Sequence, residues 1–143
     1  MSNFKEIQEQ NKAVVRTFNA EVIERGHQAA VPALVSEHFV NRSAGVAEPS
    51  GMDGMLYVFN EILRPAFPDL KVEIIEQLAV DDKVITRKQI RGTHRGPLLG
   101  IEPTNEPVAI DVIDIVRVED GKYVEHWGVN TFLGVMAALR AKA

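Results

Sequence analysis

The spacing of apolar residues changes near the middle of this 143-residue chain. In the first part, apolar residues recur every three or four positions, which is the repeat of one helix face. From Leu70 onward, apolar and polar residues alternate, as they do in strands that bury one face. Helices that come first and strands that come afterwards predict an α+β fold and exclude one built of alternating βαβ units.

A stripe of apolar residues predicts a long first helix over residues 3–25. Its members are Phe4, Ile7, Val14, Phe18 and Val22. Gly26 follows the stripe and is expected to end the helix. A short second helix is expected over residues 32–36, because Pro32 would occupy the first turn, where proline is tolerated.

A third helix is predicted over residues 52–64. Its apolar stripe consists of Met52, Met55, Leu56, Phe59, Ile62 and Leu63. Pro65 is expected to end this helix, since proline disfavours a helical conformation in the residue before it. The preceding segment, residues 43–51, is rich in Ser, Ala, Gly and Pro and predicts a loop.

Four strands and a helical tail are predicted in the second half of the chain. The strands cover residues 70–80, 83–95, 108–118 and 123–131, and the tail covers residues 132–143. Between the last two strands stands Asp120-Gly121, a dipeptide typical of two-residue hairpins. The pattern therefore predicts an antiparallel meander.

A two-residue turn at Asp120 and Gly121 also predicts a register for the last hairpin. The paired residues would be Val118 with Tyr123, Asp114 with Trp127, Val112 with Val129, and Ile110 with Thr131. A single bulged residue would shift every pair beyond it and exchange the two faces of the strand.

The overall composition is that of an ordinary globular chain, with 45% hydrophobic residues, and predicts one domain over residues 1–143. A net charge of −4 gives no field that would attract nucleic acid or an anionic membrane, so we expect neither partner. No apolar run approaches the length of a membrane span. The start of the chain carries charge where a signal peptide needs an apolar run, so we expect a cytoplasmic protein. Because cysteine is absent, disulfides and thiolate chemistry are excluded.

Three stretches of the second half resemble recurring motifs of one protein family. They are Gly92-Thr93-His94-Arg95-Gly96, Gly100-Ile101-Glu102-Pro103-Thr104 and Asp120-Gly121-Lys122-Tyr123-Val124-Glu125-His126-Trp127. These motifs, together with the order of elements, resemble SnoaL-like polyketide cyclases, also labelled ester cyclases, of the nuclear transport factor 2-like superfamily. The resemblance implies a cone in which N-terminal helices pack on a curved, mainly antiparallel sheet.

The resemblance also implies a chemistry. It is an intramolecular aldol condensation of a small hydrophobic or aromatic carbonyl ligand, performed without cofactor or metal by an acidic residue in the cone. The resemblance further implies a homodimer that associates through an outer face of the sheet. In the family, the catalytic aspartate follows the tryptophan by four residues, and this chain has Thr131 at that position.

The substitution at Thr131 leaves three functions open. The chain could retain the cyclase chemistry with another base, or bind a hydrophobic ligand without converting it. It could also act as an isomerase or hydrolase, since the fold does not determine the reaction type.

Asp114 is the candidate for the replacement base, because it lies in the otherwise apolar stretch Ile113-Asp114-Ile115-Val116. If it faces a pocket, burial would raise its pKa and suit it to proton abstraction. The alternative is a structural carboxylate paired with Arg87 or Arg91. The predicted strand over residues 83–95, which contains these two arginines, also carries Lys88. Its arginines are expected to pair with Glu73 and Glu76 across the hairpin.

Five further side chains, Thr131 among them, are candidates for contact with a substrate. His94 could donate a hydrogen bond to a substrate carbonyl, or it could merely hold its loop. Trp127 would form an aromatic wall beside Val129, or else belong to the core. Asn41 could bind substrate or cap a turn. His126 adjoins Trp127 and should therefore point the other way, away from the pocket.

The four histidines, at positions 27, 38, 94 and 126, lack the close spacing of metal ligands, so no metal site is predicted.

Overall fold

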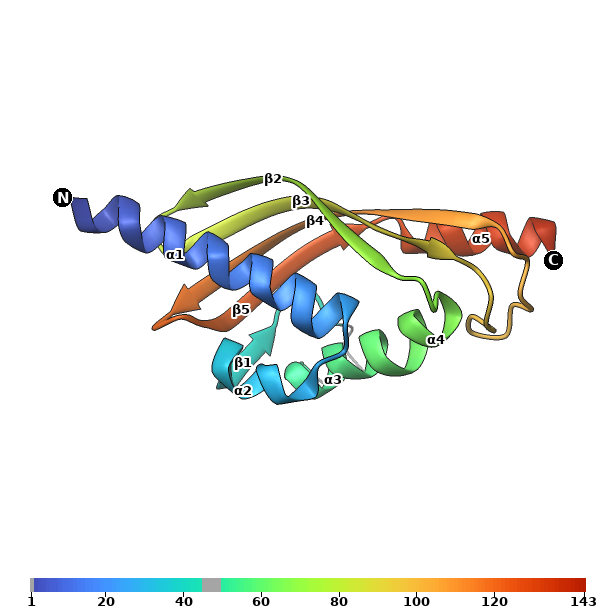
Figure 1. Cartoon of the computed structure of the whole chain (residues 1–143), viewed down its shortest axis with the longest axis horizontal. Helices are drawn as coiled ribbons and strands as arrows, with labels where there is room; N and C mark the ends of the chain where they lie inside the picture. The colour runs from blue at the N-terminus through green and yellow to red at the C-terminus, as the bar shows by residue number, and fades with distance from the viewer. Residues whose placement is uncertain (1, 45–49) are drawn as a thin grey trace.

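The computed structural model describes residues 2–44 and 50–143, in which helices cover one face of a five-stranded sheet (Figure 1). The strand order is β1-β5-β4-β3-β2. Four of the strands form an antiparallel meander: β2 (Lys71–Val80), β3 (Lys83–Thr93), β4 (Pro107–Glu119) and β5 (Lys122–Asn130). These are the four predicted strands, and the predicted α+β fold is confirmed.

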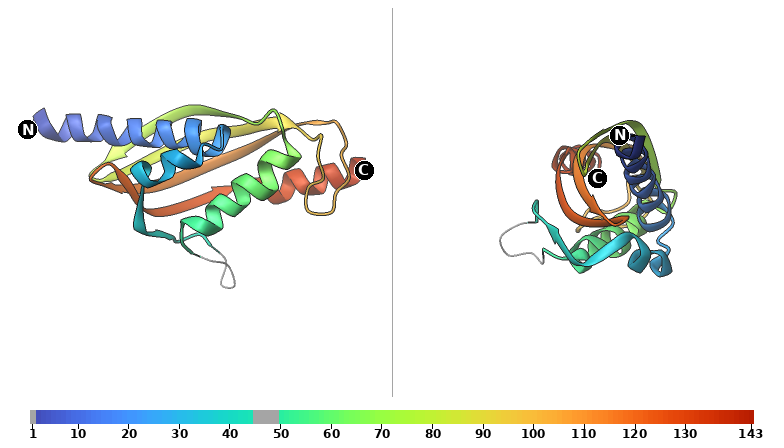
Figure 2. Two further views of the ribbon diagram at one scale, coloured as in Figure 1. Left: turned by 60° about the horizontal axis from the view of Figure 1, so that its bottom comes forward. Right: turned by 90° about the vertical axis from the view of Figure 1, so that its left-hand side faces the viewer.

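The sheet is strongly twisted and curved. Viewed along the long axis of the molecule, its strands bend around an interior that the helices close from the opposite side (Figure 2). The chain therefore has the predicted architecture, a cone of helices on a curved, mainly antiparallel sheet.

The edge strand β1 (Val35–Asn41) was not predicted. It pairs in parallel with β5, and Asn41 lies opposite His126. The helix predicted over residues 32–36 is α2 (Val31–Leu34) in the structure, and residues 35 and 36 belong to β1 instead. A parallel edge strand leaves no hairpin turn in the sequence, because its partner lies far along the chain.

The first helix agrees with its prediction. It comprises α1 (Ser2–Phe18) and a wider, π-helical continuation over Asn19–Glu24. Phe18 is buried and stacks on Tyr123 of β5, with the ring centroids 4.3 Å apart. Phe4 and Ile7 are exposed, because the first turns of α1 extend past the end of the strands (Figure 1).

The third helix has three parts: α3 (Met52–Tyr57), a π-helical segment over Val58–Leu63, and α4 (Arg64–Ala66). The helix was expected to end before Pro65, and it runs only one residue past it, to Ala66. Of the loop predicted over residues 43–51, residues 45–49 lie outside the described residues.

The last hairpin turns at Asp120 and Gly121, which both have positive φ, as a two-residue type I′ turn requires. Val118 faces Tyr123 as predicted, but β5 has a bulge immediately afterwards, so that Arg117 faces Glu125. Every later pair is shifted by one residue. The observed pairs are Ile115 with Trp127, Asp114 with Gly128, Ile113 with Val129, and Val112 with Asn130. The predicted pairs of Asp114, Val112 and Ile110 are therefore wrong.

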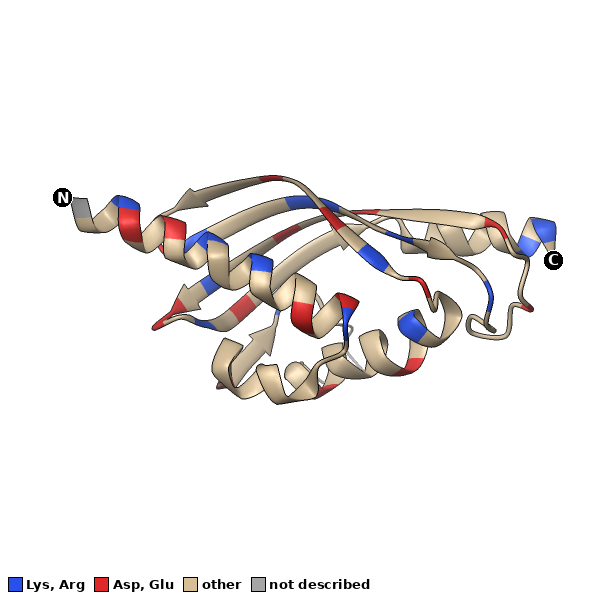
Figure 3. Ribbon diagram, in the orientation of Figure 1, with Lys and Arg blue, Asp and Glu red and all other residues tan. Residues whose placement is uncertain are grey.

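Charged residues of both signs are interleaved along α1 and the strands (Figure 3). Arg87 pairs with Glu76 and Arg91 pairs with Glu73 across the β2–β3 hairpin, as predicted. None of the helices described, over residues 2–44 and 50–143, is both long and apolar enough to cross a bilayer.

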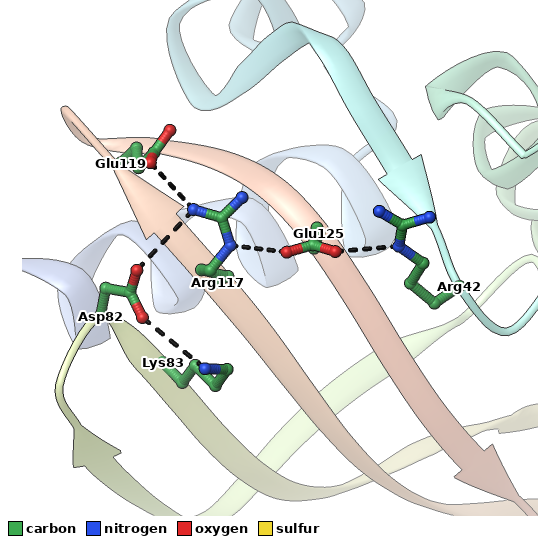
Figure 4. Close-up of polar contacts among 6 residues, drawn as sticks. All are labelled: Arg42, Asp82, Lys83, Arg117, Glu119 and Glu125. Atoms are coloured by element: carbon green, nitrogen blue, oxygen red, sulfur yellow. Dashed lines mark hydrogen bonds and ion pairs between the residues drawn. The ribbon is translucent and has the colours of Figure 1, made fainter.

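A chain of ion pairs fastens the end of β1 to the neighbouring strands (Figure 4). Arg117 contacts Asp82, Glu119 and Glu125, and Glu125 also accepts a hydrogen bond from Arg42 at 2.8 Å. The Arg117 and Arg42 guanidinium groups lower the pKa of the Glu125 carboxyl. This arrangement holds Asn41, the residue before Arg42, beside β5.

The helix α5 (Phe132–Lys142) follows β5 and confirms the predicted tail. It packs against β4 and buries Met136 and Leu139.

Two glycines provide a test of the packing around α4 and α5. A Cβ at Gly96 would overlap the carbonyl oxygen of Pro65, whereas a Cβ at Gly134 would meet nothing within 4 Å. We expect Gly96→Ala to lower the free energy of unfolding by about 1–3 kcal/mol through overpacking. Gly134→Ala, in a helix, should raise it by roughly 0.5–1 kcal/mol. Urea denaturation measures both, and equal effects would contradict this packing.

Candidate active site

A cavity of about 720 Å³ lies between the concave face of the sheet and the helices. Its apolar walls include Phe18, Phe59, Ile62, Leu63, Ile90 and Val112. The volume is in the range of small-molecule sites in proteins.

Polar side chains of the cavity lining form one connected cluster. Lys88 Nζ lies 3.1 Å from Asp114 Oδ2, and His126 Nε2 lies 3.8 Å from the same oxygen. On the far side of the imidazole, His126 Nδ1 lies 2.9 Å from Asn41 Oδ1. All four residues line the cavity, so a ligand inside it would meet a base, a cation and an imidazole together.

Asp114 lies in β4 with its side chain on the concave face and is 5% exposed. Burial raises the pKa of its carboxyl, but the nearby Lys88 ammonium and the contact with His126 outweigh burial and leave the pKa below its ordinary value of 3.8. The expected rise in pKa is therefore wrong. Asp114 Oδ1 has no hydrogen-bond partner among the described residues.

Lys88 lies in β3 and is also buried, with 4% of its surface exposed. Its ammonium donates to Asn19 Oδ1 at 2.6 Å, and Asn19 in turn donates to the Val15 carbonyl at 2.8 Å. Asn19 begins the π-helical turn that follows α1, and such turns are frequent at functional sites. Asp114 therefore pairs with Lys88, and not with Arg87 or Arg91, which both lie on the convex face.

The hydrogen bonds of Asn41 determine the tautomer of His126. The Ser43 N–H donates to Asn41 Oδ1 at 3.1 Å, which identifies the oxygen side of the amide. Since His126 Nδ1 contacts the same oxygen, Nδ1 must carry the hydrogen. The other ring nitrogen, Nε2, faces Asp114 Oδ2 at 3.8 Å.

The bulge in β5 exchanges the predicted orientations of His126 and Trp127. His126 lies on the concave face with Asp114, and Trp127, opposite Ile115, lies on the convex face. The aromatic wall expected from Trp127 is therefore on the other side of the sheet. Val129 lies in the outward register and is 70% exposed, yet it borders the cavity at its mouth.

His94 is fully buried in the connection between β3 and β4 and is not part of the cavity lining. Its Nδ1 accepts from the Thr104 N–H at 3.2 Å and lies 3.0 Å from Thr104 Oγ1. Its ring also packs against Phe67, with the centroids 6.1 Å apart. These contacts are those of a histidine that holds its loop, which was the structural alternative.

Thr131 stands at the junction of β5 and α5. Its hydroxyl oxygen accepts from the Asp111 N–H at 2.9 Å, while Asn130 and Phe132 on either side line the cavity. At the position where the family carries its aspartate, this chain therefore has a threonine whose hydroxyl makes a structural hydrogen bond. Within the described residues, no group of three or more His, Asp or Glu side chains is arranged to hold a metal ion.

Sequence reasoning identified Asp114 and Asn41 as candidates but missed Lys88, His126 and Asn19. Side chains alternate between the two faces of a strand, so Lys88 points to the face opposite to that of its neighbours Arg87 and Gln89. This alternation could have placed Lys88 on the concave face. The orientation of His126 had no such signal, because the bulge reverses the alternation of side chains from which it was predicted.

The fold, with its cavity between the sheet and the helices, defines a protein of the nuclear transport factor 2-like superfamily. Residues 13–139 match the model of the SnoaL-like polyketide cyclase family. The chain belongs to this family, as its motifs indicated. A comparison with curated protein sequences found no significant match.

Solved structures of other proteins are similar over nearly the whole chain. AclR from Streptomyces galilaeus, a proposed hydroxylase, is 26% identical with a TM-score of 0.79, and the match covers 92% of this chain and 96% of AclR. IdmH from Streptomyces antibioticus, a proposed polyketide cyclase, is 25% identical with a TM-score of 0.78, and the match covers 91% of this chain and 98% of IdmH.

The buried pair of Lys88 and Asp114 makes a testable prediction about stability. Lys88→Met leaves a buried carboxylate without its cation and should lower the free energy of unfolding by about 3–5 kcal/mol. The double variant Lys88→Met/Asp114→Asn removes both charges and should lie much closer to wild type. Urea denaturation of the variants measures this difference.

The same pair predicts a dependence on pH. Because the pKa of Asp114 is lowered in the folded state, its stabilising contribution is present above the ordinary aspartate pKa and is lost as the pH falls through the folded-state pKa. The double variant should therefore lose less stability in acid than wild type.

As a control for the stability of Lys88→Met, Arg87→Met removes an exposed ion pair and should cost only about 0–1 kcal/mol. A Lys88→Met variant as stable as the double variant would contradict the prediction.

Proposed function

We propose that this protein is a cofactor-independent cyclase that catalyses an intramolecular aldol condensation of a small hydrophobic carbonyl compound. The observation that supports this most is the Asp114 carboxylate, which is buried in the lining of an apolar cavity and has one oxygen without a partner. A carboxylate in such a site suits the removal of a proton from carbon beside a carbonyl.

The steps follow from the position of the base. The Asp114 carboxylate takes the proton, and the electron pair of the broken C–H bond forms an enolate. The enolate carbon attacks a second carbonyl of the same molecule and forms the new C–C bond. The resulting alkoxide takes back the proton from Asp114, which restores the carboxylate.

The lowered pKa of Asp114 restricts the substrate. The carboxylate is ionised at neutral pH but is a weak base, so the proton that it removes must be unusually acidic. Carbon between two carbonyl groups supplies such a proton, and β-keto esters are therefore the proposed class. Asn41 and Val129, at the border of the cavity, are proposed to contact the substrate.

A second candidate function is ligand binding without conversion. The supporting observation is Thr131, whose hydroxyl is engaged by the Asp111 backbone and offers no acid or base where the family carries aspartate. An isomerase or hydrolase that uses Asp114 is the remaining alternative.

Incubation with β-keto esters, followed by mass spectrometry of the products, tests the proposal. A cyclase gives a product of unchanged mass or one that has lost water, a hydroxylase adds oxygen, and a binding protein returns the substrate. We expect Asp114→Asn to lower turnover at least a hundredfold, in line with the range for general bases.

The matched control is Asp111→Asn, which changes an aspartate of the same strand on the convex face, where it accepts from Gln89 at 2.7 Å. This variant should retain turnover. Unchanged turnover in Asp114→Asn would remove Asp114 as the base.

The proposed assembly is a homodimer formed through the convex face of the sheet. An apolar row crosses four strands there, with Leu78 opposite Ile85, Ile85 opposite Ile115, and Ile115 opposite Trp127. Leu78 is more than half exposed, as is Val80 two residues further along β2. Contiguous exposed apolar side chains favour association with another protein surface.

Light scattering coupled to size-exclusion chromatography tests this assembly. Wild type should elute with the mass of a dimer, and Leu78→Glu should shift it to the monomer, since a buried charge opposes association. Leu133→Glu, the same change at an exposed site in α5, should leave the dimer intact. A monomeric wild type would refute the assembly.

The proposed location of the protein is the cytoplasm.

A further inference from the structure

The ammonium group of Lys88 has a hydrogen to spare. An ammonium carries three N–H donors. Two of them have acceptors, Asn19 Oδ1 at 2.6 Å and Asp114 Oδ2 at 3.1 Å, and the described residues provide no third. Because Lys88 lines the cavity and is almost fully buried, the remaining N–H is available to a molecule in the cavity.

Next to this donor stands an acceptor that is also unused. Asp114 Oδ1 is buried without a hydrogen bond, while Oδ2 of the same carboxylate contacts Lys88. Asp114 and Lys88 both belong to the cavity lining, so a carboxylate and a cationic donor stand side by side there. A ligand that loses a proton from carbon while charge develops on an adjacent oxygen is complementary to both.

We propose that Lys88 is a catalytic residue that binds the enolate oxygen of the substrate through its third N–H. The enolate forms when the C–H electron pair moves into the new C=C bond and the carbonyl oxygen takes up the negative charge, while the proton passes to the Asp114 carboxylate. This inference rests on the proposed function for the identity of the reacting molecule. The site itself is one for a flat oxyanion, such as an enolate or a phenolate.

The charges of the cluster favour this assignment. Before proton transfer, Lys88 is balanced by Asp114. After transfer Asp114 is neutral, and the negative charge stands on the enolate oxygen beside the same ammonium. The buried cluster therefore keeps its net charge while the anion moves, and in a site of low dielectric a preorganised cation stabilises such an anion strongly.

His94, the donor that the sequence suggested for this role, lies outside the cavity lining. Its Nδ1 is engaged by Thr104, and its ring is fully buried in the loop. Lys88 in β3 therefore supplies the hydrogen-bond donor to the substrate oxygen that His94 cannot supply from its loop.

Binding of 4-nitrophenolate tests the oxyanion site without any turnover. Asp114→Asn imitates the protonated carboxyl of the enolate state and leaves Lys88 without an anion. We expect this variant to bind the probe at least tenfold more tightly than wild type, as measured by calorimetry and by the absorbance of the phenolate. A charge-assisted hydrogen bond corresponds to a change of roughly tenfold to a hundredfold.

Adding Lys88→Met to Asp114→Asn should abolish the gain. The matched control is Arg87→Met in the Asp114→Asn background, which removes a cation from the neighbouring residue on the convex face and should leave the gain intact. If Asp114→Asn does not fold, the comparison is made between wild type and Lys88→Gln, and the affinity should fall about tenfold.

A gain that persists without Lys88, or an equal affinity in wild type and Asp114→Asn, would overturn the oxyanion site. The outcome does not depend on β-keto ester turnover. If the probe binds in a Lys88-dependent manner and no ester is converted, the anion site stands and the cyclase is refuted.

Discussion

The buried contact between Lys88 and Asp114 is the interaction on which the candidate site depends. Removing two charges from water is costly, and only close pairing with additional hydrogen bonds makes their burial tolerable. Here Asn19 shares the ammonium and His126 stands beside the carboxylate. Three elements, the first helix, β3 and β4, must therefore meet in one arrangement for the cavity wall to form.

The same pair determines the chemical character of Asp114. An isolated carboxyl in this apolar cavity would have a raised pKa and act as a stronger base. With Lys88 beside it, the carboxyl instead remains ionised and weakly basic. The site is therefore suited to acidic carbon, and it offers a cation at the point where the resulting oxyanion would lie.

A single bulge after Tyr123 decides which aromatic residue faces the cavity. Without it, Trp127 would line the cavity and His126 would lie on the convex face. With it, His126 joins Asp114, and Trp127 extends an apolar row on the convex face together with Ile115. One inserted residue thus supplies the site with an imidazole and the opposite face with an indole, because side chains alternate along a strand.

The sequence by itself determined the elements that local patterns encode. The apolar stripes of the helices, the alternation of four strands and the Asp-Gly turn depend on neighbouring residues, and the structure confirms them, as it confirms the family motifs. Tertiary structure alone decided the parallel pairing of β1, the bulge in β5 and the pairing of Lys88 with Asp114. These features depend on contacts between segments distant along the chain, whose energies no local pattern of residues expresses.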